Sequence, residues 1–160
     1  MGNAMLEAII KIAITSEEKG SRFYALMAKK SVNDKIKSIF ERLSREELEH
    51  KAAFEKILRY EIESSNEVGI SESEIKLLDT LAKTGVFHKM ITGEDTSIET
   101  PEEALALGIL AEKDAILLYQ GIYNQAGSQI IKDMMSRLLE EEKMHLVELR
   151  DNMEELERQV

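Results

Sequence analysis

The amino-acid sequence repeats itself after 95 residues, and this repeat restricts the possible folds more than any other feature. The stretch "REELEH", which ends at His50, recurs as "EEEKMH", which ends at His145. The matched pairs are Glu17 and Glu112, Tyr24 and Tyr119, Ile36 and Ile131, Arg42 and Arg137, Leu43 and Leu138, Glu46 and Glu141, Glu47 and Glu142, and His50 and His145. Two similar segments that pack antiparallel have an approximate two-fold axis, so any ligand near that axis is bound by matched pairs of residues.

Each copy of the repeat has the periodicity of two long helices. Glu, Lys, Leu, Ile and Ala dominate the chain, while proline occurs once and glycine eight times, which favours helices over sheet. Apolar residues recur at helical spacing over roughly 4–30, 34–62, 101–126 and 128–158. Thr100, Pro101 and Glu103 have the pattern of a helix start with a capping box. Gly127 and Ser128 predict the end of one helix and the start of the next.

The lengths of the connections indicate the topology. Two turns are short, so the helices pair into antiparallel hairpins over 4–62 and 100–158. The connection at 63–99 is long enough to run the length of the bundle, and "SESE" at 71–74 predicts a short helix within it. We therefore predict a single all-α domain over residues 1–160, a four-helix bundle made of two hairpins joined by one crossover.

Every predicted helix has a glutamate on its apolar stripe at about mid-length. A helix keeps residues i, i+3, i+4 and i+7 on one side, and by this spacing Glu17, Glu47 and Glu142 all face the core. The polar residues predicted to be buried are Glu17, Glu47, His50, Glu112, Glu142 and His145. A stripe can be misassigned by one position, so Glu46 and Glu141 are alternatives to their neighbours.

Four carboxylates in a core repel one another, and burying them without partners is very costly. Two divalent cations would balance the four negative charges and remove most of that cost. A Glu from each of two helices, with Glu-x-x-His from each of the other two, is the ligand set of di-metal carboxylate bundles. Oxygen-rich ligation with one imidazole per metal suits iron or manganese better than a closed zinc site. We therefore predict a buried site for two divalent metal ions, with iron or manganese favoured over zinc.

The joint spacing is the evidence for this site. A lone Glu-x-x-His would mean little, because glutamate makes up 25 of the 160 residues. The interval from Glu17 to His50 is 33 residues, and the interval from Glu112 to His145 is also 33. Duplication of a plain bundle could preserve this spacing, but it would not favour four acids on the buried stripes.

Tyr24 and Tyr119 lie two turns after Glu17 and Glu112 on the same faces. Two interpretations are open: the rings fill the core, or the hydroxyls hydrogen-bond a metal-binding carboxylate across the bundle. The third histidine, His88, falls in the crossover and has no counterpart in the repeat, so we expect a surface or packing role.

Composition narrows the possible partners. The chain has no cysteine, which excludes disulfides, thiolate metal sites and iron–sulfur clusters within it. Its net charge of −10 argues against nucleic acid and anionic membrane surfaces as partners. No apolar run approaches the roughly 18 to 20 residues that span a bilayer, and the N-terminus lacks the pattern of a signal peptide. We expect a cytoplasmic protein.

Over about residues 5–158 the sequence resembles the rubrerythrin branch of the ferritin-like superfamily. The segments that carry the resemblance are "SEEKGSRFY", "IFERLSREELEH", "AEKDAILLY" and "MMSRLLEEEKMH". The resemblance implies a ferritin-like bundle with a di-iron centre that reacts with peroxide or dioxygen, and a role in oxidative stress. Carried over by position, it implies the ligands Glu17, Glu47, His50, Glu112, Glu142 and His145, with Glu47 and Glu142 bridging the two metals.

Two features differ from rubrerythrins. Rubrerythrins proper carry a rubredoxin-type iron site on four cysteines, which this chain lacks, so electrons would come from another protein or a small reductant. Rubrerythrins also have an extra glutamate one turn after the ligand of the third helix, involved in redox-linked movement of the iron. Here that position is Ala115, with Gly20 in the other half, which argues against peroxidase turnover by that movement.

The resemblance thus favours a redox enzyme, a peroxidase or ferroxidase with an external electron donor. The alternatives are iron storage or delivery in a larger assembly, and a bundle that metal merely stabilises. We expect a homo-oligomer, in the first instance a dimer, and the helices of such bundles can also exchange between chains.

Overall fold

The computed structural model describes residues 4–64, 71–73, 76–77, 79–80 and 98–160. Its long helices are α1 (Ala4–Lys30), α2 (Asp34–Ser64), α5 (Pro101–Gln125) and α6 (Gln129–Arg158). These described ranges contain no strand. The predicted all-α four-helix bundle is confirmed, and α2 ends two residues later than the sequence suggested.

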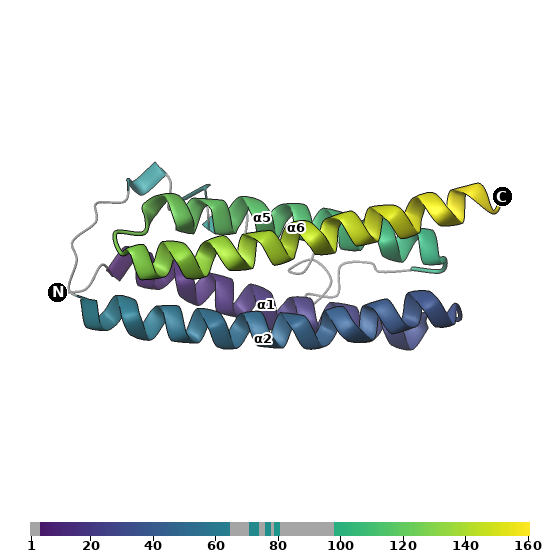
Figure 1. Ribbon diagram of the computed structural model, residues 1–160, viewed down its shortest axis with the longest axis horizontal. Helices are drawn as coiled ribbons and strands as arrows, with labels where there is room; N and C mark the ends of the chain where they lie inside the picture. The colour runs from purple at the N-terminus through teal and green to yellow at the C-terminus, as the bar shows by residue number, and fades with distance from the viewer. Residues whose placement is uncertain (1–3, 65–70, 74–75, 78, 81–97) are drawn as a thin grey trace.

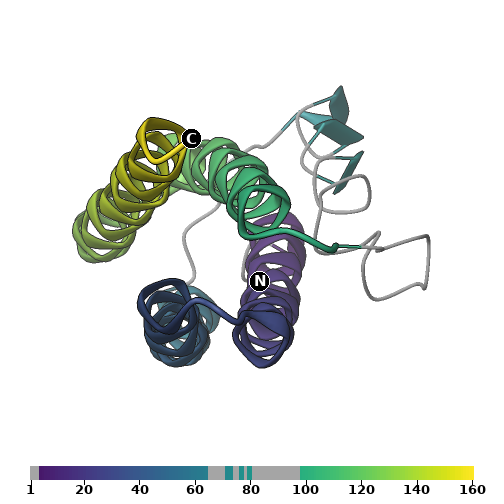
Figure 2. The ribbon, with the colours of Figure 1, turned by 90° about the vertical axis from the view of Figure 1, so that its right-hand side faces the viewer.

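The helices form two antiparallel hairpins, α1 with α2 and α5 with α6 (Figure 1). α5 starts at the end of the bundle where α2 starts, so the connection between them returns the chain along the full length of the bundle. The hairpins face each other with α1 against α5 and α2 against α6 (Figure 2). In the crossover, residues 72–73, 76–77 and 79–80 are helical, as predicted for part of this connection, whereas His88 lies outside the described residues.

Local signals in the sequence explain where the helices begin. The Thr100 hydroxyl accepts a hydrogen bond from the Glu103 amide at 3.2 Å, and Glu103 Oε2 accepts one from the Thr100 amide at 3.3 Å, which completes the predicted capping box. The Asn33 side chain accepts from the Ile36 amide at 3.1 Å and caps α2. The turn before α6 is weaker, because Ser128 makes no capping hydrogen bond through its side chain.

The apolar stripes meet in two separate clusters, one toward each end of the bundle. One cluster includes Leu6, Ile9, Phe54, Ile57, Tyr119, Ile122 and Met135, and the other includes Phe23, Met27, Phe40, Leu43, Leu105 and Leu149. Burial of each large apolar side chain stabilises the fold by about 1.5–3 kcal/mol, so these clusters hold the hairpins together. A layer of buried acidic and imidazole side chains lies between them. No helix among the described residues is both long and apolar enough to cross a membrane.

Candidate metal centre

Each of the four helices contributes one buried carboxylate to the layer between the apolar clusters. The side chains are Glu17 from α1, Glu47 from α2, Glu112 from α5 and Glu142 from α6, and each residue is at most 2% exposed. They face inward because they continue the helical spacing of the apolar residues before and after them. The structure thus brings together the four glutamates that helical spacing predicted to face the core.

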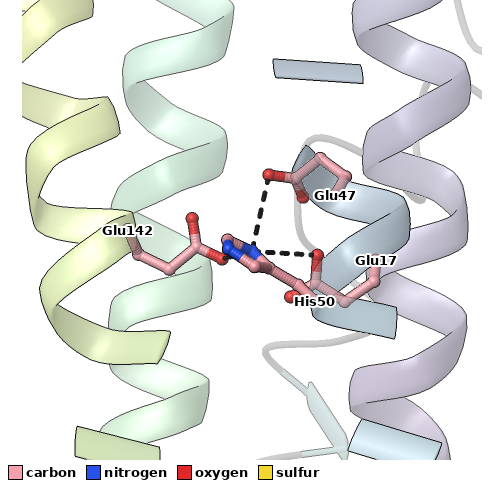
Figure 3. A group of neighbouring side chains, drawn as sticks. All are labelled: Glu17, Glu47, His50 and Glu142. Carbon is pink, nitrogen blue, oxygen red and sulfur yellow. Dashed lines mark hydrogen bonds and ion pairs between the residues drawn. The ribbon is translucent and has the colours of Figure 1, made fainter. Parts of the chain in front are cut away.

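The carboxylates and the two histidines form two overlapping groups. One group consists of Glu17, Glu47, His50 and Glu142 (Figure 3), and the other of Glu47, Glu112, Glu142 and His145. Within each group, one potential ligand atom from every residue lies within 4.8 Å of the others. Glu47 and Glu142 belong to both groups, which is the placement expected of carboxylates that bridge two metal ions.

Both histidines direct Nδ1 toward the carboxylates. His50 Nδ1 lies 3.0 Å from Glu142 Oε1, and His145 Nδ1 lies 3.1 Å from Glu142 Oε2. The same nitrogens lie 4.0 and 3.7 Å from Glu47 Oε1. The two rings are nearly parallel, with centroids 5.5 Å apart and planes inclined by 18°. The imidazoles therefore offer one nitrogen each to the interior, and each nitrogen contacts a different oxygen of Glu142.

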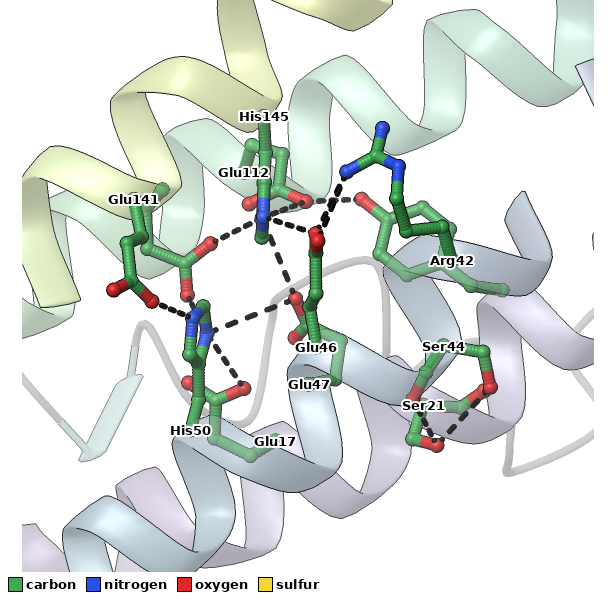
Figure 4. A network of polar contacts seen from close by, with 12 residues as sticks. Glu17, Ser21, Arg42, Ser44, Glu46, Glu47, His50, Glu112, Glu141 and His145 are labelled. Carbon is green, nitrogen blue, oxygen red and sulfur yellow. Dashed lines mark hydrogen bonds and ion pairs between the residues drawn. The ribbon is translucent and has the colours of Figure 1, made fainter. Parts of the chain in front are cut away.

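The outer nitrogen of each histidine contacts a glutamate of the opposite hairpin (Figure 4). His50 Nε2 lies 2.8 Å from Glu141 Oε2, and His145 Nε2 lies 2.9 Å from Glu46 Oε2. Glu46 and Glu141, which the sequence left as alternative ligands, thus belong to neither group of ligand atoms. An imidazole that donates its Nε2 proton to a carboxylate has its Nδ1 lone pair free for a metal, so these acids orient the histidines. The doubled acid in Glu-Glu-x-x-His, present in both halves, is the sequence signal for this role.

Each of the two buried tyrosines hydrogen-bonds a glutamate of the other hairpin. Tyr24 on α1 donates its hydroxyl proton to Glu112 on α5, and Tyr119 on α5 donates to Glu17 on α1. Burial raises the pKa of both tyrosines well above 10, and the charges of Glu112 and Glu17 raise it further. The hydroxyls therefore stay protonated and remain donors. Of the two interpretations open at the sequence level, the hydrogen bond to a carboxylate is present in the structure.

Burial makes three of the four carboxyl groups resist ionisation. It is the main cause that raises the pKa of Glu17, Glu47 and Glu112 above 4.5. The charge of Glu142 adds to the effect at Glu17 and Glu112, and the charge of Glu17 does so at Glu47. Without a cation, these three groups therefore favour their protonated forms.

Glu142 and His50 contact each other, and each favours the charged form of the other. Burial alone would raise the pKa of Glu142, but hydrogen bonds with His145 and His50 outweigh it and lower that pKa far below 4.5. Burial would lower the pKa of His50, but its hydrogen bond with Glu142 and the nearby carboxylate of Glu17, 3.7 Å away, raise it to about 12. In the metal-free protein the Glu142 carboxylate therefore lies against a protonated imidazole, which occupies the place of a cation.

The donor set fits two metal ions. Glu17 Oε2 and Glu47 Oε1 are buried and have no hydrogen-bond partner, a costly arrangement unless a cation binds them. Oxygen and nitrogen ligands about 2.1 Å from an ion lie at most about 4.2 Å apart. The potential ligand atoms of each group lie within 4.8 Å of one another, so each group needs only a small contraction to bind one ion.

A groove between α2 and α6 leads to the outer side of this layer. It has a volume of about 620 Å³ and is lined by Arg42, Glu46, Glu49, Glu140, Glu141, Met144, His145 and Glu148. His145 is the residue that connects the groove with the buried carboxylates. The groove therefore adjoins the centre on the side of His145.

Comparison with known proteins agrees with this geometry. The family model described as Rubrerythrin matches residues 8–153, which is most of the chain. Searches of curated proteins and of solved structures found no significant match. The family match covers all six residues of the two groups, and the buried glutamates and histidines fit the metal site that a ferritin-like di-iron domain requires. The chain belongs to the rubrerythrin family of di-iron carboxylate proteins.

Proposed function

We propose that this protein is a di-iron oxidoreductase that reacts with hydrogen peroxide or dioxygen, as a peroxidase or a ferroxidase. The observation that supports this most is the overlap of two ligand groups at Glu47 and Glu142, each group with its own histidine. Two metals that share carboxylates lie close enough to act on one small oxidant. Membership of the rubrerythrin family supports iron as the metal.

In this proposal Glu17 and His50 would hold one ion, and Glu112 and His145 would hold the other. Glu47 and Glu142, which belong to both groups, would be shared between the two ions. When bound, two ferrous ions supply one electron each and act as Lewis acids toward the oxidant.

The chain itself supplies a preformed and largely dry site. The Tyr24 and Tyr119 hydroxyls hold one oxygen each of Glu112 and Glu17, which restricts the motion of these carboxylates. Their protons stay on the phenol oxygens, because the pKa of both groups is raised well above 10 by burial. The apolar clusters flank the layer on both sides, and we expect small molecules to enter through the groove beside His145.

The electrons must come from outside the described centre, because the chain has no cysteine for a second iron site. We therefore propose an external protein or small-molecule donor, with peroxide or dioxygen as acceptor. The further elements of this proposal are a homo-oligomer, in the first instance a dimer, and a location in the cytoplasm.

Iron storage or delivery is the second candidate function, and the acidic lining of the groove favours it. Five glutamates line the groove that reaches His145, and a negative field concentrates cations at such an opening. Storage predicts that iron accumulates far beyond two ions per chain. An oxidoreductase predicts a limit of two ions and consumption of the oxidant when a donor is present.

Metal analysis of the wild type and of Glu47→Ala is the primary test. Glu47 contributes to both groups, so its loss should reduce the iron content from two ions per chain to one or none. Glu55→Ala is the matched control, because Glu55 lies on the exposed side of the same helix and outside the groove, so this variant should retain both ions. A wild-type protein that is supplied with iron and retains no stoichiometric metal would refute the proposal. Peroxide consumption by the ferrous protein with an added donor then tests the reaction itself.

A further inference from the structure

Arg42 breaks the approximate two-fold symmetry of the centre. Its Nη1 donates to both carboxylate oxygens of Glu46, at 3.1 and 2.8 Å, and its Nη2 donates to Glu148 on α6. Glu46 Oε2 in turn contacts Nε2 of His145 at 2.9 Å. The contacts form a chain from Glu148 through Arg42 and Glu46 to His145, and Figure 4 shows the part of it around Arg42, Glu46 and His145.

Among the residues that the structure describes, the second hairpin has no such chain. The residue that matches Arg42 is Arg137, which is exposed and makes no ion pair within the part of the chain that the structure describes. The sequence explains part of this difference, because the position that matches Glu148 is Ala53, which offers no acceptor. Arg137 therefore lacks the second acceptor that Glu148 provides to Arg42.

The two glutamates that hold the histidines are therefore held unequally. Glu141 contacts His50 Nε2 at 2.8 Å, but its side chain is 58% exposed, and among the described residues no arginine binds it. The Glu46 side chain is 30% exposed and is fixed by Arg42 on one side and His145 on the other. A carboxylate that is itself held in place restricts the imidazole more than one that can rotate into solvent, because less side-chain entropy is lost when the metal binds.

We propose that Arg42 is a positioning residue that holds Glu46 against His145 and so makes the metal position at His145 bind a divalent transition metal more tightly than the position at His50. The inference rests on the proposed two-metal site and adds an order of binding to it. When metal is added, the His145 position fills first. When metal is removed, the His50 position empties first.

Titration of the metal-free protein with Co²⁺, in competition with a chelating indicator, tests this order. The wild type should bind two ions in two resolved steps. Arg42→Gln should weaken the tighter step about 10- to 100-fold, the usual effect of losing a residue that supports a metal ligand. It should also change the visible absorption of the first Co²⁺ equivalent, which a purely structural role would not do. Arg42→Lys, which keeps the charge, should restore part of the affinity.

Two further variants assign the steps to the positions. Arg137→Gln is the matched control at the equivalent position and should leave both steps unchanged. Glu141→Gln, which alters only the partner of His50, should weaken the looser step and leave the tighter one as it is. If Arg42→Gln does not fold, Glu148→Gln removes only the outer anchor of the arginine and should weaken the tighter step by a smaller factor.

The outcomes separate this inference from the proposed function. A wild-type chain that binds no stoichiometric Co²⁺ overturns the two-metal site and the inference with it. Two ions bound with equal affinity overturn the inference alone. Equal metal dissociation constants in Arg42→Gln and Arg137→Gln would also overturn it. An Arg42→Gln protein with a lower melting temperature but unchanged metal dissociation constants would overturn it as well.

Discussion

Removing the metal should make the stability of this protein fall steeply as pH rises from 6 to 8. In the folded metal-free protein, burial raises the pKa of Glu17, Glu47 and Glu112 above 4.5. In the unfolded chain these groups ionise near 4.5. Above that pH the folded state holds more protons than the unfolded state, so its stability decreases as pH rises until these groups ionise in the folded state as well.

The magnitude follows from the number of protons that the folded state retains. Each retained proton changes stability by about 1.4 kcal/mol per pH unit, so a single one corresponds to about 2.7 kcal/mol between pH 6 and 8. For a domain of this size, 1 kcal/mol corresponds to about 2–4 °C in melting temperature, so a fall of at least about 5 °C is expected. His50 acts in the same direction. Its folded-state pKa of about 12 lies above its ordinary 6.5, so its contribution is lost as pH rises.

Glu142 provides the opposite contribution but does not alter this window. Because its folded-state pKa is lowered, it stabilises the protein above pH 4.5, and this contribution is lost only as pH falls below that value. Thermal unfolding of chelator-treated protein at pH 6, 7 and 8, followed by circular dichroism, measures the effect. The iron-loaded protein is the control, and its melting temperature should change little because cations replace the protons. A metal-free protein whose melting temperature is constant or rises over this range would refute the account of the buried acids.

Three substitutions test other parts of the structure. Tyr119→Phe removes the donor to Glu17 and should weaken metal binding about 10- to 100-fold by competition titration, with little change in helix content; an unchanged constant would mean that the hydroxyl does not support the site. Thr100→Ala removes the capping box of α5 and should cost about 1 kcal/mol in chemical denaturation while the chain still binds two metal ions; a loss of metal would contradict the separation of cap and centre. Phe54→Ala opens a cavity beside Tyr119 in the core and should cost about 3–5 kcal/mol, a loss that a surface position such as Glu49→Ala should not show.

The fold and the inward-facing acids could be predicted because both depend on local periodicity. Glu17 and Glu47 lie on their stripes by simple spacing, and the 95-residue repeat supplied the matching Glu112 and Glu142. The capping box at Thr100 likewise depends on residues within one helical turn. Such features need only the geometry of one helix, so a single sequence is sufficient to find them.

The contacts around the outer histidine nitrogens could not be predicted in the same way. Spacing places Glu47 on the apolar stripe, but it does not say what the neighbouring Glu46 contacts. That Glu46 contacts His145 depends on the separation and rotation of α2 and α6, which no residue within either helix determines. The contact of Arg42 with Glu148 joins residues 106 positions apart and has no equivalent in the repeat.

The crosswise arrangement of the centre bears on how such a bundle can originate. The first hairpin supplies three of the four residues of one metal group, and the second hairpin supplies three of the four of the other. Each hairpin also carries one tyrosine whose acceptor lies in its partner. Two identical copies of a single hairpin would therefore contain every ligand and every donor that the centre uses. A half-length ancestor that paired with itself could have held both metals, and gene duplication with fusion would then have joined the halves and allowed Arg42 and Arg137 to acquire different surroundings.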